Sequence, residues 1–569
     1  MRYVHSNGKM ASQKVVNILV LTTTLSVCLD YGVTEDGPTV QTQFGTVRGK
    51  YVDEGVIFLG LPFAVPPVGE LRWKPPEVYN TSWAPAVRDG TLPGPACRQP
   101  KCGPTYNDVQ HICNRDANRT QSEDCLYLNI FAPKCALNST VTPLPVLFWI
   151  HGGNYRIGTG AALVYDGRFL ANKTQTVVVT INYRLGAFGF LVTGEGEDDA
   201  KGNFGLLDQL QALAWVQENI GSFGGDKNKV TIFGQSAGSD SVATHMISNK
   251  TLGLFKQAIM MSVPFSIPHK SRQEALRLGK YFAQQLNCSP GDMTCLRSKE
   301  PAVILDTQNK LNSHIVDPFK PIESFMQWGP SIDYDVVPAP TVDSFAKGNF
   351  QKKPFIIGTT LQENVFYVYQ AYTKNITSKL KLDEIVATFV QEKAIPILEE
   401  YKPQTSQDYR AILSEIATDW IFTCPTRKVA RSAGRYRKDV WLYLYDHVWS
   451  FKHLWDEWKF CNGHVCHGED IPFVFQTPLL ANLTFTTDEQ HMADTIAYHY
   501  GNFAHTGDPN IPAHNINSTN NGKPKVVNWP KYSTDGYFYR LNITTPENNL
   551  LDNYLYERCD VFDRRNVYH

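Results

Sequence analysis

Three short runs of residues constrain the fold of this chain more than any other feature. Residues 146–150, 176–181 and 230–233 are apolar or β-branched at every position. A strand needs such a run when both of its faces are buried, as in a parallel sheet covered by helices. Between the last two runs, residues 206–220 place their apolar side chains at helical spacing. Strand, helix and strand in this order predict a right-handed crossover within an α/β fold.

Composition and charge narrow the possible functions of the 569-residue chain. Hydrophobic residues make up 42% and charged residues 19%, which excludes a chain that is disordered throughout. Lys and Arg number 54 against 55 Asp and Glu, so the net charge of −1 predicts no nucleic-acid partner. We see no polar linker and expect residues 31–569 to form one domain. Helical patterns at 273–286 and 381–400 are expected to cover the sheet.

The N-terminus has the features of an export signal. Arg2, Lys9 and Lys14 precede an apolar run at 15–29, which Asn17 and three threonines interrupt. That run is too short and too polar for a membrane helix of about 20 residues. We therefore expect residues 1–30 to be a signal peptide, with an uncleaved anchor as the alternative. No other segment has the length of a membrane span, so the prediction is a secreted or extracellular protein.

The glycosylation sequons and the cysteines also indicate a secreted or extracellular protein. Ten Asn-x-Ser/Thr sequons predict a glycoprotein. They begin at Asn80, Asn118, Asn138, Asn172, Asn249, Asn287, Asn375, Asn482, Asn517 and Asn542. Twelve cysteines suit an oxidising environment, and eleven remain if Cys28 leaves with the signal, so at least one is expected to be free or intermolecular. Local pairs are Cys288 with Cys295, Cys102 with Cys113 and Cys461 with Cys466, although sequence alone leaves the connectivity open.

The segment that follows the third apolar run predicts a nucleophile. It reads Gly234-Gln-Ser-Ala-Gly238 and precedes a helix-like stretch at 241–248. A Gly-x-Ser-x-Gly motif between a strand and a helix is the setting of a nucleophile elbow, in which a sharp turn exposes the serine hydroxyl. The two glycines are needed where a side chain would collide with neighbouring backbone. We predict that Ser236 is the nucleophile.

A serine nucleophile also needs a base, an acid that orients the base, and donors for the oxyanion. The loop Gly152-Gly153-Asn154 follows His151 at the end of the first apolar run, and it is a good source of N–H donors. Asn154 suits this role because asparagine tolerates left-handed backbone. Ala237, directly after the nucleophile, supplies a further N–H.

Five further stretches complete a family resemblance. They are residues 44–49, 122–129, 182–186, 202–209 and 222–238. With them the chain resembles the type-B carboxylesterase/cholinesterase family from about residue 38 to its end. The resemblance implies an α/β-hydrolase fold, with a large central, mostly parallel, twisted sheet covered by helices on both faces. It also implies a serine esterase acting on small carboxylic esters, with no cofactor or metal and with the catalytic order Ser, Glu, His.

The resemblance locates the acid and the base. The family's Gly-x4-Glu spacing, counted from Gly358, falls on Glu363. The family's histidine lies six residues before a Phe-Val-Phe sequence, which selects His467 over the rival His464. Glu469 and Asp470 are too close in sequence to His467 to be preferred as the orienting acid.

The cysteines and histidines at 461–467 could also be read as metal ligands, but an oxidising compartment favours a Cys461–Cys466 disulfide. By resemblance, Cys97 pairs with Cys125, Cys288 with Cys295 and Cys424 with Cys559. The resemblance likewise implies buried ion pairs between Arg72 and Glu123 and between Arg184 and Asp208.

Departures from the family pattern bear on the substrate. Cholinesterases hold a quaternary ammonium on a tryptophan, and that position here is Arg115. The residue before the nucleophile is usually glutamate and here is Gln235. Both changes favour a general carboxylesterase, while a cholinesterase and a non-catalytic adhesion protein remain alternatives. Four large side chains are expected to line the substrate pocket beside Gln235, namely Met326, Trp328, Phe366 and Tyr367.

Overall fold

The computed structural model describes residues 37–100, 121–402, 407–451, 458–513, 526–534 and 537–568. Several predictions from the sequence fall outside these ranges: the signal segment 1–30, Cys28, Cys102, Cys113, Arg115, Asn118 and Asn517. The strands are β1 (Thr39–Thr42), β2 (Gly45–Arg48), β3 (Lys50–Val52), β4 (Gly55–Pro62), β5 (Arg88–Asp89), β6 (Ala96–Cys97), β7 (Gln121–Ser122), β8 (Tyr127–Ala132), β9 (Leu144–Ile150), β10 (Val177–Ile181), β11 (Gly225–Gln235), β12 (Gln257–Met261), β13 (Phe355–Thr360), β14 (Val440–Tyr445), β15 (Ser533–Thr534), β16 (Tyr537–Ile543) and β17 (Asn549–Asp552).

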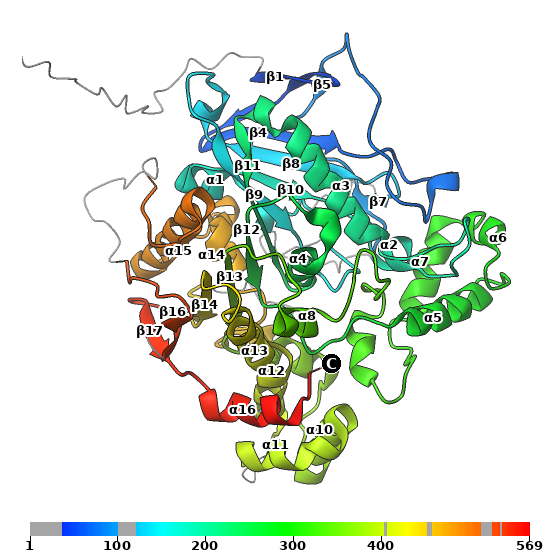
Figure 1. Cartoon of the computed structure of the whole chain (residues 1–569), viewed down its shortest axis with the longest axis vertical. Helices are drawn as coiled ribbons and strands as arrows, with labels where there is room; N and C mark the ends of the chain where they lie inside the picture. The colour runs from blue at the N-terminus through cyan, green and yellow to red at the C-terminus, as the bar shows by residue number, and fades with distance from the viewer. Residues whose placement is uncertain are drawn as a thin grey trace, which may run out of the picture.

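The α-helices separate successive strands from β9 to β15 (Figure 1). They are α1 (Arg168–Thr174), α2 (Gly186–Phe190), α3 (Phe204–Asn219), α4 (Ala237–Ile247), α5 (Arg272–Gln285), α6 (Met293–Arg297), α7 (Pro301–Lys310), α8 (Thr341–Lys347), α9 (Val365–Ala371), α10 (Lys379–Val390), α11 (Ala394–Tyr401), α12 (Arg410–Thr418), α13 (Cys424–Ala433), α14 (Ile471–Phe475), α15 (Thr487–Thr506) and α16 (Tyr556–Arg565).

One large sheet organises the molecule. Its twelve strands follow the order β15-β16-β14-β13-β12-β11-β9-β10-β8-β4-β3, with β17 beside β16. Neighbours from β10 through β16 pair in parallel, and antiparallel pairs lie at both margins. The three apolar runs of the sequence are β9, β10 and the second half of β11, which lie side by side. The predicted α/β fold with a mostly parallel central sheet is therefore confirmed.

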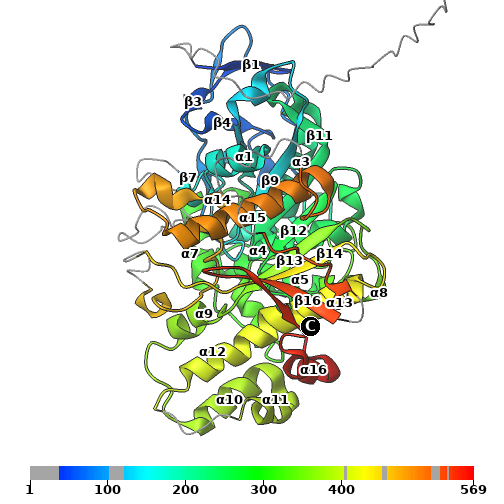
Figure 2. The ribbon, with the colours of Figure 1, turned by 90° about the vertical axis from the view of Figure 1, so that its left-hand side faces the viewer.

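Helices bury both faces of this sheet, which explains why its strands are apolar at every position. Along β9, Leu147 and Trp149 belong to one buried cluster, whereas Phe148 and Ile150 belong to the other. Successive side chains of a strand point to opposite faces, so both faces need apolar cover. Helices α1, α14 and α15 lie against one face (Figure 2). Helices α3, α4 and α13 contact strands of the sheet through the other cluster.

The predicted helices mostly match the structure. The patterns at 206–220 and 273–286 correspond to α3 and α5, within two residues at each end. The expected helix over 381–400 is instead two helices, α10 and α11, joined at a short turn where Gln391 has a φ of 55°. Pro396 explains the break, because a proline inside a continuous helix would lack a hydrogen bond and collide with the carbonyl four residues earlier.

Four disulfides join eight of the nine described cysteines in pairs that the sequence analysis names: Cys97–Cys125, Cys288–Cys295, Cys424–Cys559 and Cys461–Cys466. No cysteine is free among the described residues, so a leftover cysteine would have to lie outside them. The two expected ion pairs are present, with Arg72 Nε at 2.6 Å from Glu123 Oε1 and Arg184 Nη2 at 2.8 Å from Asp208 Oδ1.

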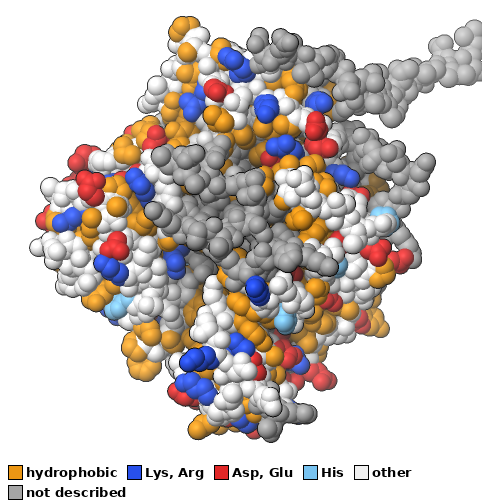
Figure 3. Space-filling view, turned by 180° about the vertical axis from the view of Figure 1, so that it is seen from behind, with side chains coloured by type: hydrophobic (Ala, Val, Ile, Leu, Met, Phe, Trp, Pro, Cys, Tyr) orange, Lys and Arg blue, Asp and Glu red, His pale blue; other side chains and the backbone are white. Residues whose placement is uncertain are grey.

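The sequons differ in accessibility. Asn80, Asn249, Asn287, Asn375 and Asn482 are exposed, and Asn138 and Asn172 are half-buried. Asn542 lies in β16 and is only 6% exposed, so its amide has no room for a glycan and this predicted site is corrected. Acidic and basic side chains are interspersed over the face seen in Figure 3 rather than gathered into a patch of one sign. Within the described ranges, no helix combines the length and apolarity that crossing a bilayer requires.

Candidate active site

The turn between β11 and α4 presents Ser236. Its backbone has φ 58° and ψ −127°, a conformation that a residue with a side chain adopts only under strain. The flanking glycines make the turn possible, because a Cβ on Gly238 would lie 2.0 Å from Ile150 O and one on Gly234 would lie 2.6 Å from Gly238 C. The structure therefore has the sharp strand-to-helix turn that the sequence motif predicts.

The loop after β9 faces this turn. Gly153 and Asn154 have φ values of 106° and 55°, so asparagine does adopt the left-handed backbone expected of it. A Cβ on Gly152 would lie 2.6 Å from Gln235 O, which shows how closely the loop approaches the serine turn. The N–H groups of Gly153 and Asn154 make no main-chain hydrogen bond within the described residues. Ala237 begins α4, and the N–H of a first helical residue has no partner inside its helix.

Glu363 and His467 lie together although 104 residues separate them. Glu363 follows β13 and is fully buried; its Oε2 is 2.5 Å from His467 Nδ1, and its Oε1 accepts from the Thr360 N–H at 2.8 Å. The imidazole also packs against the rings of Tyr367 and Phe422, with centroid distances of 5.4 and 5.1 Å. The carboxylate thus fixes the ring orientation, and the aromatic contacts hold the ring in place.

The second imidazole nitrogen has a partner that the sequence did not suggest. His467 Nε2 lies 3.0 Å from Nε2 of Gln235, so the amide donates to the imidazole. Among the described residues, this nitrogen bonds to Gln235 rather than to the hydroxyl of Ser236. Burial, followed by the negative charge of Glu363, raises the pKa of the neighbouring Tyr367. Hydrogen bonds between a nucleophile and its base often form only once substrate is bound.

Gln362 makes a contact beside Glu363 and His467 that sequence reasoning missed. Its N–H donates to Val465 O at 3.0 Å, and its side-chain Oε1 accepts from the Val465 N–H at 2.9 Å. This pair joins the loop of the acid to the loop of the base. The Cys461–Cys466 disulfide braces the latter loop one residue before His467, and it leaves neither sulfur as a thiolate ligand for a metal. No motif pointed to Gln362, because the contact depends on two loops that are distant in sequence.

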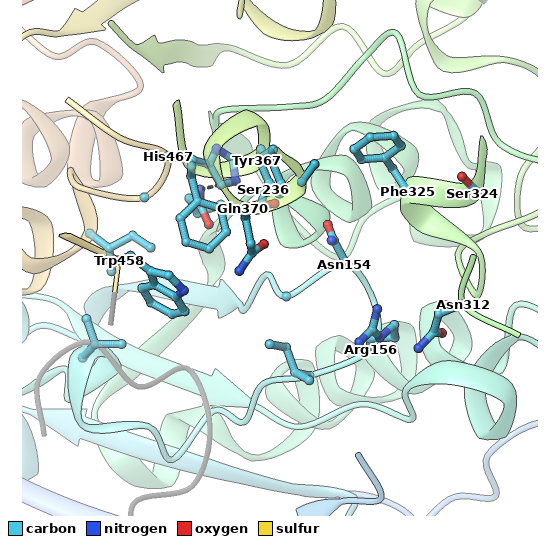
Figure 4. A pocket seen from close by; sticks show the side chains of 18 of the residues that line it. Asn154, Arg156, Ser236, Asn312, Ser324, Phe325, Tyr367, Gln370, Trp458 and His467 are labelled. Atoms are coloured by element: carbon cyan, nitrogen blue, oxygen red, sulfur yellow. Dashed lines mark hydrogen bonds between the residues drawn. The ribbon is translucent and has the colours of Figure 1, made fainter. Parts of the chain in front are cut away.

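A cavity of about 590 Å³ opens beside Ser236 and His467 (Figure 4). Its size is in the range of small-molecule sites, which is about 300–1,000 Å³. Gln235, Phe366 and Tyr367 line it, as expected from the sequence. The remaining walls include Asn154, Arg156, Asn312, Phe325, Gln370, Trp449 and Trp458.

Met326 and Trp328 do not line this cavity, which corrects their predicted role. Trp328 is 1% exposed and packs edge-on against Phe282 of α5. Met326 is 4% exposed and belongs to a buried apolar cluster. The short helix Pro321–Met326 turns Ser324 and Phe325 toward the cavity instead. Apolar side chains at 326 and 328 thus serve packing, the alternative that sequence alone left open.

Burial also changes the protonation of groups around the site. It lowers the pKa of His151 to about 4, so this histidine is neutral and its Nδ1–H donates to Gly152 O at 2.8 Å. Asp470 accepts from the Tyr443 hydroxyl at 3.0 Å, and its other oxygen has no partner in the described structure. Burial, followed by the nearby negative charge of Glu363, raises the pKa of Asp470 to about 7.

The raised pKa of Asp470 predicts a pH-dependent effect on stability. The unfolded chain releases this proton near pH 3.8, whereas the folded protein keeps it to about pH 7. Stability from this group is therefore lost as the pH rises between those values. The asparagine of Asp470→Asn has no proton to lose, so the unfolding free energy of this variant should not fall with pH in this way. The difference between the variant and wild type should therefore increase from pH 3.8 to about pH 7, by roughly 4 kcal/mol at most. Urea unfolding across this pH range measures the difference, and Asp53→Asn in an exposed turn is the control. A difference that does not change with pH would contradict the assignment.

Comparison with known proteins agrees with this geometry. The model of the carboxylesterase family matches residues 36–562. The chain belongs to the carboxylesterase family. It is 36% identical to the crystal protein of Dictyostelium discoideum over 91% of this chain and 89% of that protein. It is 34% identical to the acetylcholinesterase of Bungarus fasciatus over 87% of this chain and 81% of that enzyme.

Solved carboxylesterases share the fold. A PNB esterase structure superposes with a TM-score of 0.75 at 30% identity, covering 92% of this chain and 99% of that one. The Geobacillus stearothermophilus carboxylesterase EST55 gives a TM-score of 0.75 at 28% identity, covering 93% and 100%. The protein is therefore an α/β-hydrolase and a serine carboxylic-ester hydrolase, as its motifs predicted.

Proposed function

We propose that this carboxylesterase hydrolyses carboxylic esters through an acyl-enzyme on Ser236, with His467 as base and Glu363 as orienting acid. The observation that carries the proposal is the buried Glu363–His467 pair at 2.5 Å, whose histidine lines the same cavity as Ser236. A carboxylate on Nδ1 keeps the proton on that nitrogen and leaves Nε2 free to act as a base.

The reaction follows from these positions. Substrate binding displaces the Gln235 amide from His467 Nε2, and that nitrogen takes the proton of the Ser236 hydroxyl as Oγ attacks the ester carbonyl carbon. The oxyanion accepts hydrogen bonds from N–H groups of the Gly152–Asn154 loop and of Ala237. The imidazolium then gives its proton to the leaving alcohol, and the acyl group remains on Oγ. Water, deprotonated by the same nitrogen, attacks the acyl carbon and releases the acid and the free serine.

Neutral esters suit the cavity better than choline esters. Gln235 replaces the carboxylate common at its position, and among the described residues no Asp or Glu lines the cavity. Phe366, Trp449 and Trp458 present aromatic surface that binds apolar groups.

Hydrolysis of p-nitrophenyl butyrate tests the proposal. We expect folded protein to turn over this ester and mass spectrometry of a trapped intermediate to place the butyryl group on Ser236. We also expect a higher kcat/KM for this neutral ester than for butyrylthiocholine. No turnover by folded protein would refute the esterase assignment, and a large preference for the thiocholine would refute the substrate assignment alone.

We also propose that the chain is exported and glycosylated. The N-terminal apolar segment, the exposed sequons and the four disulfides support this proposal, since disulfides persist in oxidising compartments.

A further inference from the structure

Arg156 lies just after the loop that carries the proposed oxyanion donors. It follows Asn154 by two residues, and its N–H donates to Gly153 O at 2.9 Å. The next residue, Ile157, donates to the same carbonyl at 3.1 Å, so the backbone that carries the arginine is held rigidly. The side chain lines the catalytic cavity together with Asn154 and Asn312 (Figure 4).

Arg156 is half-buried, and its guanidinium has no anionic partner among the described residues. Its Nε is shielded from solvent and makes no hydrogen bond there, and burial lowers its pKa. Two other buried arginines have an acidic partner: Arg72 pairs with Glu123 at 2.6 Å and Arg184 with Asp208 at 2.8 Å. A third, Arg540, stacks on the ring of Tyr554 instead. A guanidinium stays protonated, so Arg156 gives the cavity a positive charge that no described acidic side chain offsets and that an anionic ligand would neutralise.

The surroundings of Arg156 favour an anionic ligand. The described lining includes no acidic side chain, and Arg156 is its only lysine or arginine. Asparagine and glutamine side chains at 154, 312 and 370 add neutral donors. An arginine fork matches the geometry of a carboxylate or another oxyanion, which it can bind through two parallel hydrogen bonds. A cationic substrate would instead be repelled.

We propose that Arg156 binds an oxyanion group carried by the substrate, so that the preferred esters of this enzyme are acidic ones, with a carboxylate away from the scissile bond. This inference rests on the proposed esterase function and narrows its substrate class. Arg156 then acts as a specificity residue: its contact with the anion is remote from the bond that breaks, and it lowers the free energy of both the bound ester and its transition state.

Paired probes that differ in charge test this inference. One pair carries the charge on the acyl side, p-nitrophenyl hydrogen suberate against its amide, p-nitrophenyl suberamate. The other carries it on the alcohol side, p-butyryloxybenzoate against p-butyryloxybenzamide. We expect wild-type kcat/KM to favour the acid over the amide by about 10-fold or more in at least one pair. The Arg156→Gln variant should lose this preference, and Arg156→Lys should keep part of it because lysine offers a point charge without the fork.

The controls separate a local contact from a general charge effect. Arg48→Gln removes an exposed arginine on β2 and should keep the wild-type ratio of acid to amide. Raised ionic strength should lower that ratio in wild type. The inference is overturned if Arg156→Gln leaves the ratio unchanged, or if wild type prefers the amides in both pairs.

Failure of this inference is distinguishable from failure of the esterase proposal. If wild type hydrolyses all four probes through Ser236 with a ratio that Arg156 does not affect, only the anion site is refuted. If folded wild type hydrolyses none of them, the esterase proposal fails. Calorimetric binding of the intact probes to Ser236→Ala, with and without Arg156→Gln, then decides on the anion site. Tighter binding of the acids that depends on Arg156 supports the site, and equal binding refutes it.

Discussion

Replacing Ser236 by alanine is expected to lower kcat for p-nitrophenyl butyrate by about 10⁴–10⁶-fold. The hydroxyl is the only protein group in the proposed reaction that forms a covalent bond to the substrate, so no acyl-enzyme can form without it. Binding should persist, because the cavity walls and the oxyanion donors stay in place. Steady-state rates and the loss of a trapped acyl adduct measure the effect.

Ser239→Ala is the matched control for this prediction. Ser239 lies one turn further along α4, is fully buried, and its hydroxyl has no hydrogen-bond partner in the described structure. Removing that hydroxyl tests for any general cost of a serine-to-alanine change in this helix. Equal activity of the Ser236→Ala variant and wild type would refute the assignment of Ser236 as the nucleophile, whatever the activity of Ser239→Ala.

Local chemistry explains which parts of the fold and site were predictable. The β11–α4 turn combines a buried strand, two glycines that no side chain could replace and a helix start, and all three are visible in consecutive residues. The residues that reach across the fold were not predictable in this way. The Gln362–Val465 hydrogen bonds and the Gln235–His467 contact join segments about a hundred or more residues apart.

The residues that line the pocket also divide into those that local sequence predicts and those that depend on distant packing. Phe366 and Tyr367 begin a helix that the acid loop places at the cavity, so their proximity to Glu363 in sequence was informative. Met326 and Trp328 are large apolar side chains that the sequence led us to expect in the pocket, but the direction of a side chain depends on which neighbours pack against it. Helix α5 provides those neighbours for Trp328. Arg156 had no motif of its own, and only its unpaired, cavity-facing position marks it.

Glu363→Gln is expected to lower kcat by about 10⁴-fold with little change in KM. The reason lies in the second contact of this side chain. Glu363 Oε1 accepts from the Thr360 N–H, so the amide oxygen of a glutamine would take that position and its NH₂ would face His467 Nδ1. An NH₂ donor forces Nδ1 to become an acceptor, which moves the imidazole proton to Nε2. That nitrogen then has no lone pair with which to deprotonate Ser236.

The chain contains a second buried pair with which to compare this change. His447 Nε2 lies 3.0 Å from Glu489 Oε1, and Glu489 is 1% exposed, but neither residue lines the catalytic cavity. Glu489→Gln therefore makes the same isosteric change beside a histidine without touching the proposed triad. We expect this control to keep kcat near the wild-type value. A similar loss in both variants would mean that the effect arises from disturbed packing, and a loss below about tenfold in Glu363→Gln alone would show that His467 does not depend on this carboxylate for its tautomer.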